Sequence, residues 1–231
     1  MRMFLIAASM PLALAAPAVA ATRTFGITGF TKVRVEGPYK VSLATGVAPF
    51  AKASGSAVAL DRVAIDVRGD TLVVHTNPSA WGGYPGQQPG PVEISLGTHD
   101  LTSAALTGAG SIAIDRAKGL TFALSVQGSG AAQIGDVAAD QLEVNLAGTA
   151  SARLGGSALK LTALVRGLSS LDAAKLSAHD VHITADGSST VDAVASDTAR
   201  VDAWGPATIR FTGRPACTLK VSGSTTVSGC R

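Results

Sequence analysis

Residues 104–150 read AALTGAGSIAIDRAKGLTFALSVQGSGAAQIGDVAADQLEVNLAGTA, and in them a glycine followed by small residues occurs three times. From here to the C-terminus the motif occurs seven times, and successive glycines are 20, 20, 19, 20, 18 and 18 residues apart. A period held this closely is typical of a solenoid in which each copy forms one coil. The seven glycines, which we call the corner glycines, are Gly108, Gly128, Gly148, Gly167, Gly187, Gly205 and Gly223.

Apolar and mixed positions alternate on both sides of each corner glycine. Around Gly128, for example, Leu124 and Val126 precede the corner, and Ala132 and Ile134 follow it. A period of two is typical of strands, and a sharp corner repeated in register needs the conformational freedom of glycine. We therefore predict an all-β fold, a parallel β-helix or solenoid of coils of about 18–20 residues. The steps of 19 and 20 residues, with no six-residue subperiod, favour the right-handed form.

Residues 1–20 have the composition of a secretory signal peptide. A basic start at Arg2 precedes an apolar run from Phe4 to Ala16, and small residues end the segment at Ala20. This order of features is that of a cleaved export signal, and we expect the cut after Ala20. We predict a periplasmic or extracellular protein. No transmembrane segment is expected, because no later stretch reaches 18 consecutive apolar residues.

Residues 21–100 are less regular but still alternate like strands. The segments Lys32–Val35 and Lys40–Leu43 flank a Gly-Pro pair, and Ala64–Val67 and Thr71–Val74 flank a Gly-Asp turn. Both arrangements are consistent with antiparallel hairpins. The end of a solenoid exposes unpaired backbone, so we predict that these pairs form an antiparallel β cap. The solenoid repeats would then occupy the rest of the chain, residues 101–231.

A loop at residues 77–91 reads NPSAWGGYPGQQPGP, and its four prolines and four glycines disfavour regular structure. It carries Trp81 and Tyr84 in a chain with only two tryptophans and two tyrosines. One interpretation is a contact loop whose aromatic side chains meet a sugar or a protein. The alternative is a linker from the cap to the solenoid, with Trp81 packed against the fold.

The chain has two cysteines, Cys217 and Cys230. They are equidistant from the Gly223-Ser224 turn, so a last coil that folds back at this turn brings them face to face. An even cysteine count in an exported chain favours a disulfide over two free thiols. We predict a structural bridge that holds the last coil closed.

The charge of the chain disfavours nucleic acid as a ligand. The formal net charge is +3, only 15% of the residues are charged, and the lysines and arginines are scattered. Neither a basic footprint for nucleic acid nor a polybasic membrane patch is present.

One outward column could carry chemistry. Five residues after the corner glycines, Asp172 and Asp192 fall on neighbouring coils and are flanked by Arg153 and Arg210. The functional interpretation is a carboxylate pair for acid-base catalysis or for calcium. The alternative is a surface ladder in which each aspartate pairs with its own arginine, and it fits better because the four charges sum to zero.

The histidines do not indicate a metal site. His179 and His182 would face opposite sides of a strand, and His75 and His99 have no fixed relation to them. There is no G-x-S-x-G elbow, phosphate-binding loop or calcium-binding nonapeptide repeat. We therefore expect no catalytic residue, no metal and no cofactor.

The G-S-G-like corners, the L-x-V-x-x-x-G arms before them, and the F-x-x-V-x-V-x-G-x-Y-x-V segment from Phe30 to Val41 resemble the putative auto-transporter adhesin, head GIN domain family. The resemblance extends from about Phe30 to the C-terminus as one continuous domain. The corners at Gly167 and Gly205 depart from it, because Leu168 and Pro206 follow them. The resemblance implies a β-helix-like fold and an adhesin-like role, and it implies no active site.

These observations predict an exported, non-catalytic β-solenoid that binds or scaffolds at the cell envelope. Its partner would be an envelope glycan or protein, met by flat faces of small polar residues and by the loop with Trp81 and Tyr84. Two alternatives are a polysaccharide lyase or hydrolase on a β-helix, and a purely structural partner in an envelope assembly. The sequence specifies neither the ligand nor the oligomeric state.

Overall fold

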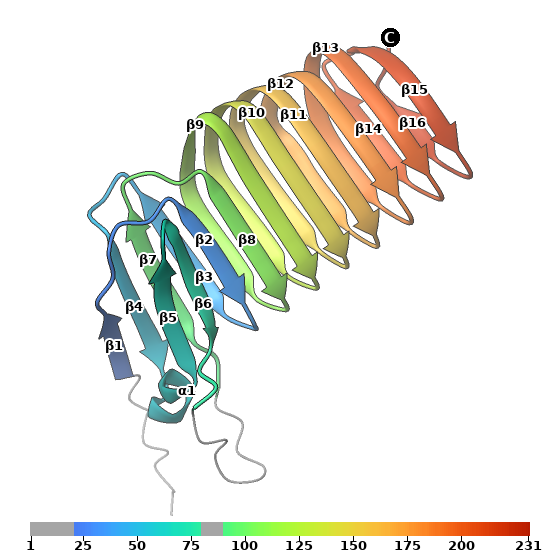
Figure 1. Ribbon diagram of the computed structural model, residues 1–231. Helices are drawn as coiled ribbons and strands as arrows, with labels where there is room; N and C mark the ends of the chain where they lie inside the picture. Colours follow the sequence, from blue (N-terminus) through green and yellow to red (C-terminus); the bar gives the residue numbers. More distant parts are fainter. Residues whose placement is uncertain (1–20, 80–89) are drawn as a thin grey trace, which may run out of the picture.

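The computed structural model describes residues 21–79 and 90–231, which form a row of stacked coils with a cap at the N-terminal end (Figure 1). The predicted signal peptide, residues 1–20, lies outside these described residues. Within them, no helix is long and apolar enough to cross a membrane. The elements are β1 (Ala21–Phe25), β2 (Lys32–Glu36), β3 (Lys40–Thr45), β4 (Phe50–Gly55), α1 (Ala57–Asp61), β5 (Val63–Arg68), β6 (Thr71–Thr76), β7 (Glu93–Thr98), β8 (Ser103–Gly108), β9 (Ser111–Gly128), β10 (Ala131–Gly148), β11 (Ser151–Gly167), β12 (Ser170–Asp186), β13 (Thr190–Trp204), β14 (Thr208–Thr212), β15 (Ala216–Ser222) and β16 (Thr226–Ser228).

The long strands β9 to β13 pair in parallel, with their corner glycines in register. Gly128 pairs with Gly108 on one side and with Gly148 on the other, and Gly148 pairs in turn with Gly167. Each long strand runs from one corner to the next. We call the part that follows a corner glycine the trailing arm and the part that precedes one the leading arm. The predicted parallel β-solenoid is confirmed.

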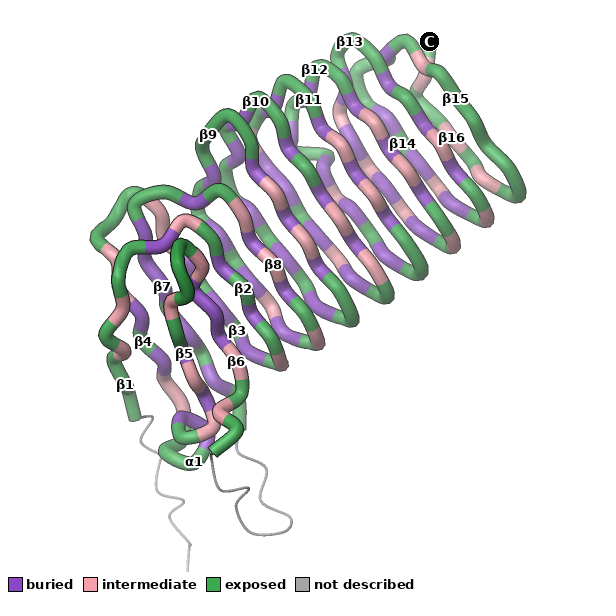
Figure 2. The backbone as a smooth tube through the Cα atoms, in the orientation of Figure 1, coloured by how far each residue is buried: buried purple, intermediate pink, exposed green. Residues whose placement is uncertain are grey.

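The apolar columns fill the interior of the solenoid, where they form continuous buried stripes (Figure 2). Leu124, Val144 and Ile183, each four residues before a corner glycine, are at most 2% exposed. Phe122 has the largest volume among the fully buried side chains of the described residues. Because each coil contacts only its neighbours, the core is continuous along the axis but thin across it.

All seven corner glycines have positive φ, between 83° at Gly167 and 113° at Gly108. The corners also stack closely on one another. A Cβ atom added to Gly128 would lie 2.7 Å from the carbonyl oxygen of Gly108, closer than real Cβ atoms come. Conformation and close approach therefore both require glycine at this position.

The pairing expected between residues 32–35 and 40–43 is wrong. Strand β2 pairs in parallel with β6 and β8, and β3 pairs in parallel with β7 and β9. The two strands are the leading and trailing arms of a coil, with Gly37 (φ 122°) at its corner beside Gly108. A hairpin and a solenoid coil have the same alternation of apolar residues. Only the strands with which β2 and β3 pair distinguish the two.

Antiparallel pairing in the N-terminal part is confirmed. Strands β5 and β6 form the predicted hairpin, and β4 pairs antiparallel with both β1 and β7. The helix α1 begins after Ser56, whose hydroxyl accepts a hydrogen bond from the Ala59 backbone N–H at 3.2 Å and caps the helix. Together these elements cover the N-terminal end of the solenoid (Figure 1).

The predicted disulfide is confirmed. Cys217 on β15 and Cys230 after β16 are bonded, with their Cα atoms 5.6 Å apart. The Arg231 backbone N–H also donates a hydrogen bond to the Pro215 carbonyl at 3.2 Å. The two arms of the last coil are thus joined at the end opposite the Gly223 corner.

Candidate functional site

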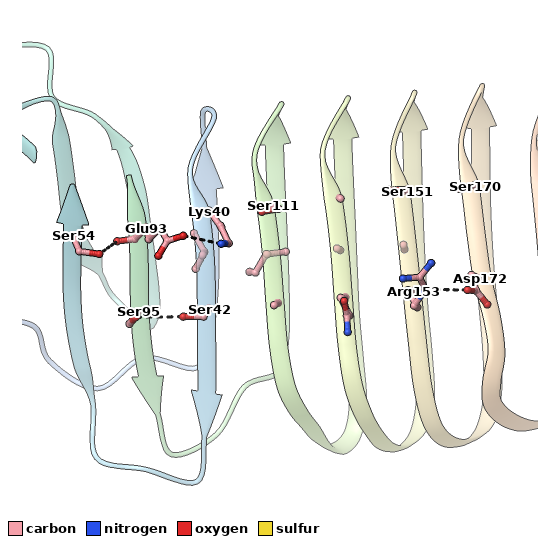
Figure 3. Close-up of a pocket in the computed structure, with 17 residues that line it drawn as sticks. Lys40, Ser42, Ser54, Glu93, Ser95, Ser111, Ser151, Arg153, Ser170 and Asp172 are labelled. Atoms are coloured by element: carbon pink, nitrogen blue, oxygen red, sulfur yellow. Dashed lines mark hydrogen bonds and ion pairs between the residues drawn. The ribbon is translucent and has the colours of Figure 1, made fainter. Parts of the chain in front are cut away.

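A shallow groove of about 550 Å³ runs across the trailing arms near the N-terminal end of the solenoid (Figure 3). Small and hydroxyl-bearing side chains make up most of its lining. We call it the serine groove. Its defining residues are Ser42, Ser95, Ser111, Ala113, Ala131, Gln133, Ser151 and Ser170.

The strand registers place these side chains in two rows. In the first row Ser111 pairs with Ala131, Ala131 with Ser151, and Ser151 with Ser170. These residues follow a corner glycine by three positions, and alternation along a strand points them away from the core. The second row, two residues further on, joins Ser95, Ser42, Ala113 and Gln133.

An ion pair lies near each end of the serine groove. Lys40 Nζ is 2.7 Å from Glu93 Oε1, and Arg153 Nε is 3.0 Å from Asp172 Oδ2 (Figure 3). Between Lys40 and Arg153 lie three strand steps, roughly 14 Å, and the groove residues on the strands between them carry no charge. Exposed pairs of this kind contribute little to stability, so their charged groups are available to a ligand.

Hydrogen bonds link some of the groove side chains to neighbouring groups. Ser42 Oγ donates to Ser95 Oγ at 3.3 Å, and Ser54 Oγ donates to the Glu93 carbonyl at 3.4 Å. Such hydroxyls can both donate and accept, and they can exchange these partners for those of a ligand. The groove therefore suits recognition of an extended polar molecule by hydrogen bonds.

The column with Asp172 and Asp192 forms the predicted ladder of ion pairs. Arg153 pairs with Asp172, and Arg210 binds Asp192 through two nitrogens, with Nε 2.6 Å from Oδ1 and Nη2 3.2 Å from Oδ2. The two aspartates are in register on β12 and β13. Each carboxylate is thus bound by a guanidinium instead of being presented as a free pair.

Electrostatics keeps this ladder charged. The Arg153 guanidinium, helped by the Ala174 backbone N–H, lowers the pKa of the Asp172 carboxyl, and Asp192 raises the pKa of Arg210. A general acid needs the opposite shift, a carboxyl pKa raised toward neutrality. Asp172 is therefore suited to ion pairing, not to proton donation.

Replacing Arg153 with glutamine should raise the pKa of Asp172 toward its ordinary value of 3.8. In the wild type, Arg153 lowers the pKa of Asp172 in the folded state. The ion pair therefore stabilises the fold at pH values above the unfolded-state pKa of Asp172. This stabilisation is lost as the pH falls through the folded-state pKa. The variant should thus lose less stability on acidification below about pH 4. An NMR titration of the Asp172 carboxyl measures the shift. Arg116→Gln, which removes a pair with Asp136 on an earlier coil, should leave the Asp172 titration unchanged.

Three histidines lie beside aspartates on neighbouring strands. His75 Nε2 is 2.9 Å from Asp66 Oδ2, and His182 Nε2 is 2.9 Å from Asp202 Oδ2. The Asp66 carboxylate raises the pKa of His75. Over residues 21–79 and 90–231, no three histidine, cysteine, aspartate or glutamate side chains cluster as metal ligands.

His179 is the third of these histidines, and its surroundings only superficially suggest a catalytic triad. Asp197 Oδ2 is 3.2 Å and Ser196 Oγ 3.4 Å from the same ring nitrogen, Nδ1. A relay needs the serine and the aspartate on different nitrogens of the imidazole. This arrangement therefore does not activate the serine.

The two predicted contact residues, Trp81 and Tyr84, lie outside the described residues. The chain leaves the described structure after Ser79 and returns at Gly90, three residues before Glu93 at one end of the serine groove. Sequence reasoning did not single out the serine groove. Its signal was visible in the third position after the corner glycines, occupied by Ser111, Ala131, Ser151, Ser170, Thr190, Thr208 and Thr226.

Comparisons with known proteins agree on the architecture. The model of a family described as putative auto-transporter adhesin, head GIN domain, matches residues 29–215. A solved structure of a putative adhesin from Bacteroides fragilis has a TM-score of 0.83 at 17% identity, covering 90% of this chain and 96% of that one. A putative lipid binding protein from Parabacteroides distasonis has a TM-score of 0.72 at 17% identity, covering 91% and 96%. A putative adhesin from Parabacteroides merdae has a TM-score of 0.68 at 16% identity, with the same coverage.

At these identities the likeness to solved structures shows the shared fold alone. A search among curated proteins found no match.

Proposed function

The chain belongs to the putative auto-transporter adhesin, head GIN domain family, and we propose that it is a non-catalytic, adhesin-like binding module at the cell envelope. Export through the predicted signal at residues 1–20 would place it there. The family and the solenoid fold support a role in presenting surfaces. The ionised, arginine-paired state of Asp172 supports binding over catalysis.

We propose that the serine groove binds an extended, polyhydroxylated glycan of the envelope. The observation that carries this proposal is the hydroxyl-rich lining between the exposed ion pairs Lys40–Glu93 and Arg153–Asp172. Serine hydroxyls match sugar hydroxyls as donors and acceptors, and the charged groups would fix the orientation of the chain. One structural neighbour is described as a lipid binding protein. An acyl chain would favour an enclosed apolar cavity, whereas this groove is open and carries serine hydroxyls and charged groups on its lining.

Trp81 and Tyr84 would supply the stacking surface that the serine groove lacks. Aromatic rings combine an apolar face with a polar edge, and sugar rings pack well against such faces. The loop that carries them rejoins the fold next to Glu93, at one end of the groove. The loop with Trp81 and Tyr84 is therefore the second part of the proposed binding site.

Blocking the serine groove should abolish glycan binding. Ala113 is exposed in the second row between Ser42 and Gln133, so an arginine there would fill the floor. On an array of envelope polysaccharides, Ala113→Arg should lose the signal of the wild type, or raise the Kd at least about tenfold. The matched control is Ser125→Arg, which places the same side chain on a leading arm.

A second variant tests the loop separately. Trp81→Ala with Tyr84→Ala should weaken binding of the same glycan, since the stacking surface is removed. Unchanged binding by the loop variant would reject the contact loop, and unchanged binding by Ala113→Arg would reject the serine groove. Release of reducing ends or unsaturated products that stops in Asp172→Asn would instead reveal a polysaccharide-degrading enzyme.

A further inference from the structure

The last coil exposes side chains that are buried in every earlier coil. Leu219 and Val221 on β15 are 44% and 47% exposed, although their neighbours on β13, Val201 and Ala203, are fully buried. Leu219 and Val221 are in register with buried residues of β13, so they lie on the interior face of the last coil. They are exposed because no following coil covers them in the described structure. The C-terminal end thus presents an apolar cross-section to solvent.

This end also presents two unpaired strand edges. In the described structure, β15 pairs with β13 alone and β16 with β14 alone. The other end of the solenoid is covered by antiparallel strands and α1 (Figure 1). Free edges with an apolar interior between them are a template for further strand pairing.

We propose that two copies of this chain join tail to tail, with β15 pairing antiparallel to β15 and β16 pairing antiparallel to β16 of the second copy. One two-fold axis can create both pairings. Leu219 lies four residues before the Gly223 corner and Val227 four residues after it, so the centres of the two edges face each other across the coil. A two-fold axis that passes beside Leu219 and Val227 places each strand antiparallel to the same strand of the second copy. The same surface then contacts itself on both copies, as in an isologous interface.

In the register set by this axis, no side chain of β15 or β16 opposes an unsuitable one of the second copy. Leu219 would oppose Leu219, and Cys217 would oppose Val221, which extends the apolar core across the interface. On the outer face, Lys220 would oppose Thr218. Strands β15 and β16 contain no other charged residue, so no like charges are directly opposed. This self-complementarity favours a second copy over an unrelated strand.

The flanking basic residues obey the same register. These residues lie just outside the two strands. Counted outward from the two-fold axis, Arg214 would fall opposite Ser224, and Arg231 would fall opposite Gly223. Each positive charge at the end of one copy therefore meets an uncharged part of the other. A surface that avoids its own charges in this way is suited to self-association.

The oligomeric state of the mature chain tests the proposal. Sedimentation velocity over concentrations up to about 100 μM should show a reversible dimer. Leu219→Lys puts two unpaired charges on the two-fold axis and should raise the dimer Kd at least about 100-fold. Leu168→Lys is the matched control, since Leu168 is 66% exposed on a corner in mid-solenoid, and it should dimerise like the wild type. Far-UV circular dichroism should show both variants folded.

A charge swap at Thr218 tests the register and does not depend on the Leu219 variant. Thr218→Glu should lower the dimer Kd by roughly threefold to tenfold, because two new pairs with Lys220 of the second copy form, and Thr218→Lys should raise it by a similar factor. The difference between the two variants should disappear when Lys220 is also replaced by alanine.

A wild-type chain that stays monomeric throughout the concentration range would overturn the proposal, and so would a dimer that Leu219→Lys leaves intact. Capture of another protein's strand by a monomeric chain would do the same. Thr218→Glu and Thr218→Lys with equal effects would exclude this register and with it the two-fold pairing proposed here.

Discussion

Replacing Gly148 with alanine should destabilise the solenoid by about 3 kcal/mol or more. Gly148 has φ 95°, a region that costs a residue with a Cβ roughly 1–3 kcal/mol. The new Cβ would also lie 2.6 Å from the Gly128 carbonyl oxygen. That oxygen accepts a hydrogen bond from the Thr149 backbone N–H at 2.8 Å. The neighbouring corner therefore cannot move aside without breaking the stacking.

A matched variant separates the strain from the steric clash. Gly46 also has positive φ, 74°, but a Cβ there would meet no atom within 4 Å. Gly46→Ala should thus cost only the conformational strain, about 1 kcal/mol. Thermal unfolding followed by circular dichroism compares the two, and the Gly148 variant should melt several degrees lower. Equal melting temperatures would show that corner stacking does not require glycine.

Truncating Phe122 should have the other large effect on stability. Phe122 is 0% exposed and pairs with Leu142 in the next coil. Phe122→Ala should lower the free energy of unfolding by about 3–5 kcal/mol, because it leaves a cavity in a core that only adjacent coils can fill. Chemical denaturation measures the change.

Leu120 provides the control for Phe122, only two residues away on the same strand. It is 77% exposed, so Leu120→Ala should change stability by less than about 0.5 kcal/mol. A Phe122→Ala variant as stable as Leu120→Ala would mean that this part of the coil is not a packed core.

Phe122 also shows where periodicity falls short. The predicted apolar columns stand two and four residues before the corner and four and six after it, and their members Leu124 and Ile134 are buried. The column six before the corner was not singled out, although it is also apolar in every copy after the first, which has Thr102 there. Its members taper from Phe122 through Leu142, Leu161 and Val181 to Ala199 and Cys217. Alternation predicts which side chains are buried only while the chain continues as an extended strand. Six residues from the corner, the sequence does not show whether the strand continues or the chain turns. Burial at this position therefore depends on where the chain bends.

The N-terminal coil and the serine groove could not be predicted for a related reason. Strand β2 pairs with β8, and between them the chain inserts β3 to β7, which hides the period that marks the later coils. Local alternation around Gly37 fits a hairpin equally well. The row that starts at Ser111 is visible in the sequence, but Lys40, Ser42 and Glu93 join it only through this long-range pairing.

Features set by neighbouring coils were predictable. The pairing of Arg153 with Asp172 and of Arg210 with Asp192 follows from the repeat spacing alone, because parallel strands in register bring equivalent positions together. The disulfide follows in the same way, since Cys217 and Cys230 are symmetric about one corner.

That disulfide has a mechanical consequence for a protein that would be held under tension. A force pulling on Arg231 passes from Cys230 directly to Cys217 through the covalent bond, so residues 218–229 are not stretched. The load then enters the rest of the chain at Cys217, the second residue of β15, and continues through Ala216. The part of the final coil between Cys217 and Cys230 therefore bears no covalent load while the disulfide is intact.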